Sequence, residues 1–344
     1  TGTRNTAVGV SAISTTTTGV DNTAIGYDAL KVDTGNTNTA MGSYALTANS
    51  TGSGNTAIGH DSSLAITTGG ENTSLGINSL RTATTGSFNT GLGGGALQST
   101  TTASNNTAVG YNSLQANTTG ASNTAVGRSA LAANTTANSN TAVGYEALDA
   151  NTTGAANIAI GHTALGANTT ANNNVAVGTS SLGLNTTGHS NVAMGTSALY
   201  ANTTASYNVA IGYEALDANT TGASNTAMGT SALGANTTGG NNTAIGVNSM
   251  VANTTGVNNT ALGLNSLDAN TTGEENTAIG DGALGANTTA HKNVSVGARS
   301  MLINTTGTSN VAVGYEALEV NTDASNNTAV GYQSLTSNTT ATYN

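Results

Sequence analysis

The sequence predicts an all-β solenoid of about twenty coils, formed as a parallel β-roll or β-helix. An asparagine recurs every seventeen residues from Asn38 to Asn344, after one sixteen-residue spacing that begins at Asn22. Each repeat opens with the same five-residue pattern, such as NTAVG at Asn106 to Gly110. Because self-similarity at a fixed short period is the signature of a repeat architecture, we assign one repeat to each coil.

The first five positions of the repeat predict a short strand and its end. With the asparagine as position 1, position 2 is β-branched, position 3 is Ala, Ser or Gly, position 4 is aliphatic and position 5 is Gly. β-Branched residues favour extended backbone, and alternation places positions 2 and 4 on one face. Glycine then permits a bend. We expect the aliphatic residue at position 4 to be buried together with the one at position 9.

The rest of the repeat predicts a second, weaker extended piece. Position 8 is Ala or Ser, and position 9 is Leu, Ile or Met except in the repeat at Asn55, where Leu64 comes one place late. From Asn117 onward, positions 11 to 15 usually read ANTTG or ANTTA. Asn and Gly tolerate left-handed backbone, so we expect a short extended segment flanked by turns. The variable positions 6, 7, 10, 16 and 17 are expected to face outward.

A stack of such coils places equivalent residues above one another in ladders. At a spacing of ~4.8 Å, twenty coils would extend ~96 Å. A helix-and-loop repeat is disfavoured by the two Gly positions and the Thr-rich sequence. The residues expected to form structural ladders are Asn106, Asn123, Asn140, Asn157, Gly110, Gly127, Gly144, Leu114, Leu131 and Leu148.

Composition excludes several classes of protein. The chain of 344 residues has 6% charged residues, a net charge of −10 and no Cys, Pro or Trp. With 6 basic residues it lacks the electrostatic footprint of a nucleic-acid-binding protein. No apolar run is long enough to span a bilayer. We expect residues 1–344 to form a single β-solenoid region cut from a longer chain, because both ends fall inside a repeat.

The thin core of each coil favours association. Two large aliphatics per coil leave one apolar face to be covered by neighbouring coils, so we expect a homotrimer. Two segments of the chain are NVAVG at Asn174 to Gly178 and NIAIGHTA at Asn157 to Ala164. They resemble the head repeats of trimeric autotransporter adhesins, the YadA-like family, and similar repeats of phage tail fibres. The resemblance implies a left-handed parallel β-roll, three chains wide, in an adhesive head or rigid fibre.

No catalytic residue, metal site or cofactor is expected. Glu146, Glu214 and Glu316 share position 7, but four and six repeats separate them, so no pair can act together. The four histidines lie far apart and are interpreted as surface residues: His60, His162, His189 and His291. The turns hold Asn and Thr in place of the closely spaced Asp of calcium-binding rolls.

Two sets of residues are candidates for contacts or modification. Asn117, Asn134 and Asn151 lie in NTT, which fits an N-glycosylation acceptor, although a turn that needs Asn creates the pattern automatically. A surface-recognition row at position 6 offers aromatic rings to glycans or proteins, or merely covers a groove. It comprises Tyr27, Tyr111, Tyr145, Tyr213, Tyr315 and Tyr332.

The sequence therefore predicts a structural fibre and adhesion protein rather than an enzyme. We expect an extracellular location, on a cell surface or virion, in a bacterial adhesin or phage tail fibre that holds or presents a receptor-binding surface. Its expected partners are further copies of itself and a host cell-surface glycan or protein. One alternative is an extracellular filament or sheath subunit. Another is an ice-binding solenoid with Thr at positions 13 and 14, although adjacent strand residues point to opposite faces.

Overall fold

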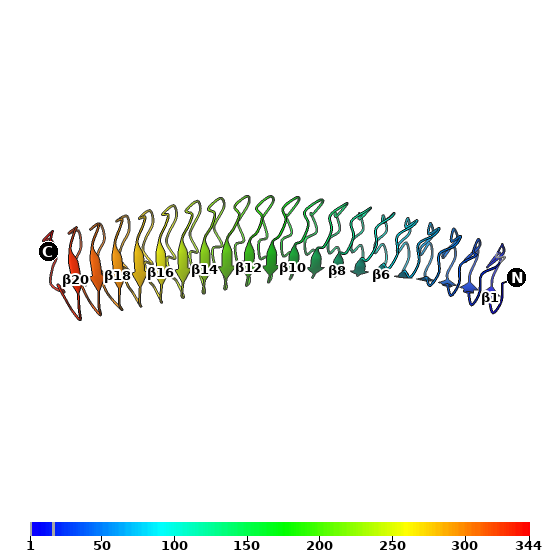
Figure 1. The fold of residues 1–344 in the computed structure, drawn as a ribbon, viewed down its shortest axis with the longest axis horizontal. Coiled ribbons are helices and arrows are strands. Elements are labelled where there is room, and N and C mark those ends of the chain that lie inside the picture. The colour runs from blue at the N-terminus through cyan, green and yellow to red at the C-terminus, as the bar shows by residue number, and fades with distance from the viewer. Residues whose placement is uncertain (1, 16–17) are drawn as a thin grey trace. The chain divides into compact units, whose positions relative to one another are not determined.

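A computed structural model describes residues 2–15 and 18–344 and confirms the predicted parallel β-solenoid with a repeat of about 17 residues. The described residues contain twenty three-residue strands and no helix, and therefore no helix that could cross a membrane. The chain divides into two compact units, Thr1–Asn173 and Asn174–Asn344. In each unit every coil contributes one strand, as Figure 1 shows.

The first unit contains ten strands. They are β1 (Thr6–Val8), β2 (Thr23–Ile25), β3 (Thr39–Met41), β4 (Thr56–Ile58), β5 (Thr73–Leu75), β6 (Thr90–Leu92), β7 (Thr107–Val109), β8 (Thr124–Val126), β9 (Thr141–Val143) and β10 (Ile158–Ile160).

The second unit also contains ten strands. They are β11 (Val175–Val177), β12 (Val192–Met194), β13 (Val209–Ile211), β14 (Thr226–Met228), β15 (Thr243–Ile245), β16 (Thr260–Leu262), β17 (Thr277–Ile279), β18 (Val294–Val296), β19 (Val311–Val313) and β20 (Thr328–Val330).

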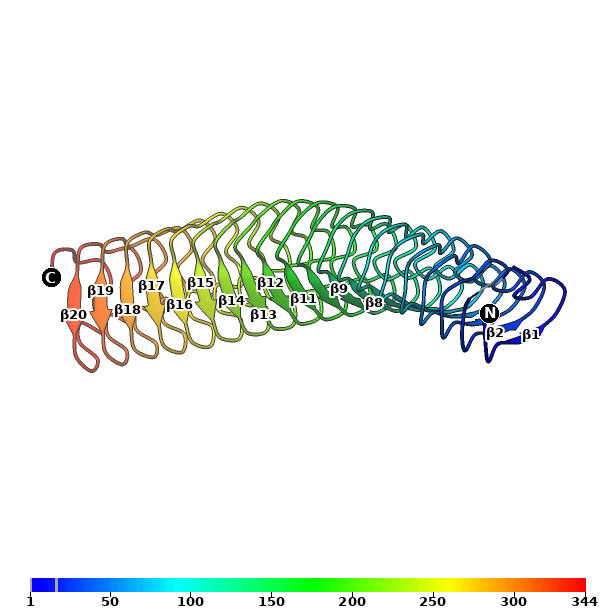
Figure 2. The same ribbon diagram turned by 45° about the vertical axis from the view of Figure 1, so that its right-hand side comes forward.

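Within each unit, neighbouring strands pair in parallel and in register. Thr107 faces Thr124, for example, and Val109 faces Val126. Figure 2 shows the strands of the second unit side by side in one sheet. This pairing stacks equivalent positions of successive repeats, because the register shift between coils equals the repeat length.

The one shorter repeat has lost its position 14. Its Thr34 donates a backbone hydrogen bond to Ser50, the residue at position 13 of the next coil. Asn22 donates to the carbonyl of Gly35 in the same way that an anchor asparagine elsewhere donates to position 15. Position 14 is exposed in ordinary coils, as at Thr119. A deletion there shortens a surface turn and leaves the ladders on both sides in register.

The core is built from position 3 and not from position 4, which corrects the sequence prediction. Ala108 and Leu114, at positions 3 and 9, are fully buried. The aliphatics at position 4 point outward: Ile160 is 40% exposed and Leu262 is 44% exposed. The coil is narrow, so the leucine from position 9 fills its interior and leaves space for only a methyl group opposite.

Positions 11 to 15 form turns and not the second extended segment that we predicted. No strand is assigned there in any described coil. The backbone is nevertheless bonded between coils, since Thr118 and Thr119 both donate to the carbonyl of Thr135 at 2.9 and 3.2 Å. These bonds satisfy the buried backbone groups without a regular ladder.

The bend before this segment uses left-handed backbone at residues that are not glycine. Asn112 has φ 55° and Leu114 has φ 50°, at positions 7 and 9. A leucine in this region costs about 1–2 kcal/mol. Two gains offset the strain, because the amide of Leu114 donates to the carbonyl of Ala130 at 3.0 Å and its side chain is fully buried.

In the irregular repeat at Asn55, the buried aliphatic side chain comes from position 12 and not from position 9. Ser63 occupies the buried position 9, and its hydroxyl bonds that of Ser74 at 2.7 Å. Leu64 is only half-buried, so the late leucine does not supply the missing core residue. Ile66 does so from position 12, where it is fully buried.

Candidate functional site

The anchor asparagines form a continuous buried ladder within each unit. The backbone amide of Asn123 donates to Oδ1 of Asn106 at 3.0 Å, and its Nδ2 donates to the carbonyl of Ala137 at 2.9 Å. Asn140 repeats this arrangement on Asn123 at 2.9 Å, and Asn157 repeats it on Asn140 at 2.9 Å. Each side chain therefore joins two coils and closes its own turn.

Glycine at position 5 is required by the stack. Gly110 has φ 132°, and a Cβ there would lie 2.5 Å from the carbonyl oxygen of Gly127. Gly127 meets Gly144 in the same way, at 2.3 Å. Both backbone conformation and coil spacing therefore exclude any side chain at this position.

The asparagines of the NTT segments are also internal. Asn117, Asn134 and Asn151 are fully buried. Nδ2 of Asn134 donates to Oδ1 of Asn117 at 2.9 Å, and Asn151 donates to Asn134 at 3.1 Å. The folded coil thus shields the nitrogen to which a glycan would be attached.

Asp33 occupies the position of this second ladder in the shorter repeat. Its Oδ1 accepts from the amide of Gly35 and from Nδ2 of Asn49, both at 2.8 Å. Oδ2 has no hydrogen-bond partner among the described residues. The carboxyl group is fully buried, and burial raises its pKa to about 6. The ionised carboxylate accepts the ladder bond of an asparagine but, unlike an asparagine, cannot donate one.

The tyrosines of position 6 are exposed, as expected for an outward row. Their exposed fractions run from 39% at Tyr145 to 72% at Tyr332. The ring of Tyr145 is stacked on His162 at 5.3 Å, and the guanidinium of Arg128 lies 5.5 Å from its centre. Tyr315 and Tyr332 stack on each other at 5.6 Å. Stacking along the coils occupies ring faces that a ligand would need.

Two tyrosines of the row have no aromatic neighbour among the described residues. They are Tyr111 and Tyr213, which are 59% and 53% exposed. A hydrogen bond to Glu214 raises the pKa of Tyr213 above its usual value. Recognition by the row stays a prediction, and these two rings are its best-placed members.

The histidines and position-7 glutamates do not gather into a site. His60 lies 3.4 Å from Asp61, and His189 packs edge-on against Tyr207 at 5.0 Å. Glu316 pairs with Arg299 at 3.2 Å. The described residues contain no group of three or more potential metal ligands.

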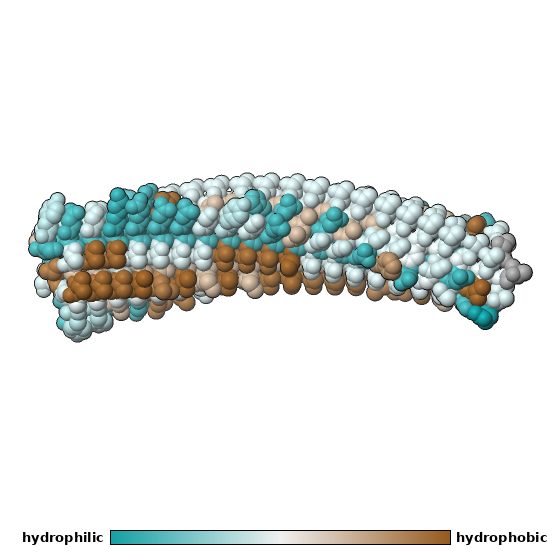
Figure 3. All heavy atoms as spheres, viewed as in Figure 1, coloured by the Kyte–Doolittle hydropathy of each residue, from teal (hydrophilic) through white to brown (hydrophobic). Residues whose placement is uncertain are grey.

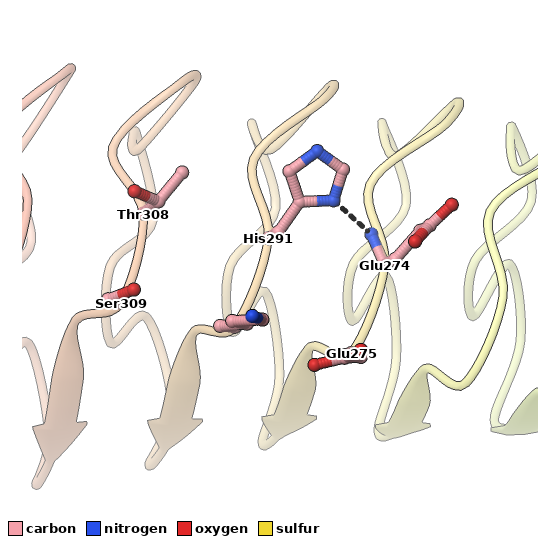
Figure 4. Close-up of a pocket in the computed structure, with 6 residues that line it drawn as sticks. Glu274, Glu275, His291, Thr308 and Ser309 are labelled. Atoms are coloured by element: carbon pink, nitrogen blue, oxygen red, sulfur yellow. Dashed lines mark hydrogen bonds between the residues drawn. The ribbon is translucent and has the colours of Figure 1, made fainter.

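A shallow hollow lies over positions 16 and 17 of three successive coils in the second unit. Glu274, Glu275, His291, Thr308 and Ser309 line it with Lys292, around about 440 Å³. Figure 4 shows them on the bends that precede β17, β18 and β19. Nδ1 of His291 accepts a bond from the amide of Glu274 at 3.0 Å. Acidic and basic groups are mixed here, so the hollow selects no ligand charge.

That histidine contact belongs to a structural device that the sequence prediction missed. At position 16 a side-chain acceptor often receives the amide of the preceding coil, as Asn138 does from Ala121 at 2.6 Å. Ser104 accepts from Ser87 at 3.0 Å in the same way. The frequent Ser and Asn at this position were the available signal, although other residues at the same position concealed it.

The outer face of the strands leaves the aliphatic side chain at position 4 exposed or half-buried in every described coil. It consists of the side chains at positions 2 and 4, and we call it the strand face. Figure 3 shows brown apolar rows along it in the second unit. Met194 and Met228 are 42% and 39% exposed on this face.

No protein-family model and no curated protein sequence matches the chain.

Proposed function

We propose that the chain is a structural fibre and adhesion protein whose coils associate as a homotrimer through the strand face. The proposal places it outside the cell, on a cell surface or a virion, where it holds or presents a receptor-binding surface. The supporting observation is the outward aliphatic at position 4, repeated in all twenty strands. The resemblance to trimeric autotransporter heads and phage tail fibres agrees with this proposal.

The strand face has the properties of an interface between copies. Leu75 is 47% exposed and Leu262 is 44% exposed, and each has an equivalent in the coils beside it. Monomeric proteins rarely leave a contiguous apolar surface of this kind uncovered. Association would remove it from water along the whole stack, and the contributions of successive coils add.

Molar mass in solution tests this proposal. We expect light scattering to give three times the chain mass of 33.4 kDa. Replacement of Met228 and Leu262 by Lys should yield a folded monomer, because charges on the strand face would have to be desolvated in the trimer. Replacement of the exposed Thr221 and Thr255 by Lys is the matched control and should leave the trimer intact. A monomeric wild-type chain would contradict the homotrimer.

A second candidate, ice binding, is favoured by one observation. Thr occupies position 2 in nine consecutive strands, β1 to β9, with its side chain on the strand face. The threonines at position 13 cannot serve, since Thr118 and Thr135 donate their hydroxyls to the carbonyls of Thr135 and Thr152. The variant in which Met228 and Leu262 are replaced by Lys tests this candidate. Ice crystals shaped by that variant would favour ice binding, and unshaped crystals would reject it.

A further inference from the structure

A second hollow in the second unit lies over positions 7 and 10, where two side chains are missing. Gly282 and Gly285 form its floor, and its volume is about 430 Å³. The backbone does not require glycine at either place. Gly282 has φ 60°, close to the 48° of Asn265 one coil before, and Gly285 has no left-handed φ. The empty space is therefore a feature of the side chains and not of the turn.

The two walls of this hollow differ in chemistry. A Cβ on Gly285 would lie 3.3 Å from Oδ1 of Asp268 on one side and 3.4 Å from Cδ1 of Leu302 on the other. Asn265 extends the polar wall. Ile303, which is 39% exposed, extends the apolar wall. A carboxylate and an amide thus face an aliphatic surface across a floor without side chains.

The cation nearest in sequence is held away from the hollow. Arg299 follows Gly282 at position 7 of the next coil, but its guanidinium bonds Glu319 at 2.6 Å and Glu316 at 3.2 Å, both on the coil that begins at Asn310. The polar wall therefore keeps an uncompensated carboxylate in Asp268, whose pKa is raised by burial. An anionic ligand would be repelled there.

We propose that the hollow between Asp268 and Leu302 is a binding subsite for one neutral sugar ring of a glycan. A pyranose carries hydroxyls on its rim that can donate to Asp268 and accept from Nδ2 of Asn265, whose Oδ1 accepts from Asn248 at 3.3 Å. Its C–H face suits Leu302. This inference rests on the proposed adhesive function, for which it names the ligand class. The subsite is expected to bind a neutral glycan and not a sialylated or uronate-bearing one.

Saturation-transfer NMR on the full chain tests this subsite. The probes are the methyl pyranosides of glucose, galactose and N-acetylglucosamine, with N-acetylneuraminic acid as the anionic probe. We expect transfer to the ring protons of a neutral pyranoside and none to the anionic sugar. The double variant Gly282→Asn, Gly285→Gln should weaken binding about tenfold, since it fills the hollow with side chains found at these positions in other coils.

The control variant is Gly166→Gln, which adds the same side chain at position 10 in the first unit and should leave the transfer unchanged. Circular dichroism should show all variants folded. Transfer that survives in the double variant, or no transfer to any neutral pyranoside, would overturn the proposal. The molar mass reports on the trimer separately, so a wild-type chain of trimeric mass that shows no transfer to any neutral pyranoside rejects the subsite alone.

Discussion

At the scale of single residues, position 5 shows how stacking and backbone conformation combine to fix one amino acid. Gly110 needs both a positive φ and the space that a Cβ would take from Gly127. The structure thus gives two separate reasons for a glycine that the sequence could only link to a bend.

The substitution Gly110→Ala should destabilise the first unit by about 2–4 kcal/mol, because the methyl group meets a backbone carbonyl that cannot move without opening the neighbouring coil. Urea unfolding followed by circular dichroism measures this. Gly166→Ala is the control, since its Cβ would meet no atom closer than 3.3 Å. Equal midpoints for the two variants would show that the stack can adjust at position 5.

Asp33 gives a pH dependence with a definite sign. Its pKa is about 6 in the folded chain and about 4 when the chain is unfolded. The folded state therefore binds the proton more tightly, and stability falls as pH rises from about 4 to above 6. Nothing in the sequence indicated this, because an Asp among asparagines in a turn reads as a solvated residue.

We expect Asp33→Asn to stabilise the chain at pH 7 by up to about 3 kcal/mol, and to leave stability at pH 4 nearly unchanged. Thermal unfolding of both proteins across this range measures the difference. The exposed Asp281→Asn should show no such trend. A gain for Asp33→Asn that is the same at both pH values would mean that the carboxyl group is protonated throughout, or that it is not desolvated.

At the scale of the coil, the asparagine at position 12 connects turns that contain no strand. Asn134 donates to Asn117 and to the carbonyl of Ala137, and accepts from Asn151. Its replacement removes these three hydrogen bonds and leaves Oδ1 of Asn117 without a partner. Asn151 and the carbonyl of Ala137 keep bonds to Gly154 and Asn123. A lost bond costs about 0.5–1.5 kcal/mol, and a buried group left unpaired costs about 1–3 kcal/mol.

The variant Asn134→Ala should therefore lose about 2–4 kcal/mol of stability. Thr136→Ala, two residues further and exposed, should change stability by less than about 0.5 kcal/mol. Hydrogen exchange on both variants would locate the loss, which we expect in the coils that contain Asn117 and Asn151. Similar protection in the two variants would mean that the ladder contributes little.

The strand itself was predictable, but the direction of its side chains was not. Alternation showed that positions 2 and 4 share one face, yet it could not decide which face is inside. Size restriction was the better signal, because position 3 is never larger than Ser while position 4 varies from Val to Met. A narrow interior tolerates less variation than an exterior, which explains why Ala108 is buried and Leu75 is not.

At the scale of the whole molecule, the period was predictable because every coil repeats the same bonds, whereas the sites were not. The subsite at Asp268 depends on two glycines that look like ordinary variation at positions 7 and 10. Only the stack brings Gly285 beneath Asp268 and beside Leu302. Features that join different coils need the register, which no single repeat contains.

The repeated NTT segments affect how the chain would fold in a secretory pathway that N-glycosylates proteins. An enzyme that glycosylates nascent chains would meet Asn134 and its equivalents before the coils close, and a glycan on Nδ2 could not occupy a fully buried position. We expect secretion through such a pathway to yield misfolded, glycosylated chains. An inhibitor of N-glycosylation should restore folding. Thr→Ala at position 14, an exposed position at Thr136, should remove glycans from the position-12 asparagines but leave the buried acceptors Asn72 (NTS) and Asn293 (NVS) in place. Mass spectrometry of the secreted protein decides the matter: a folded chain with a glycan on Asn134 would show that the position-12 ladder opens far more readily than its hydrogen bonds indicate.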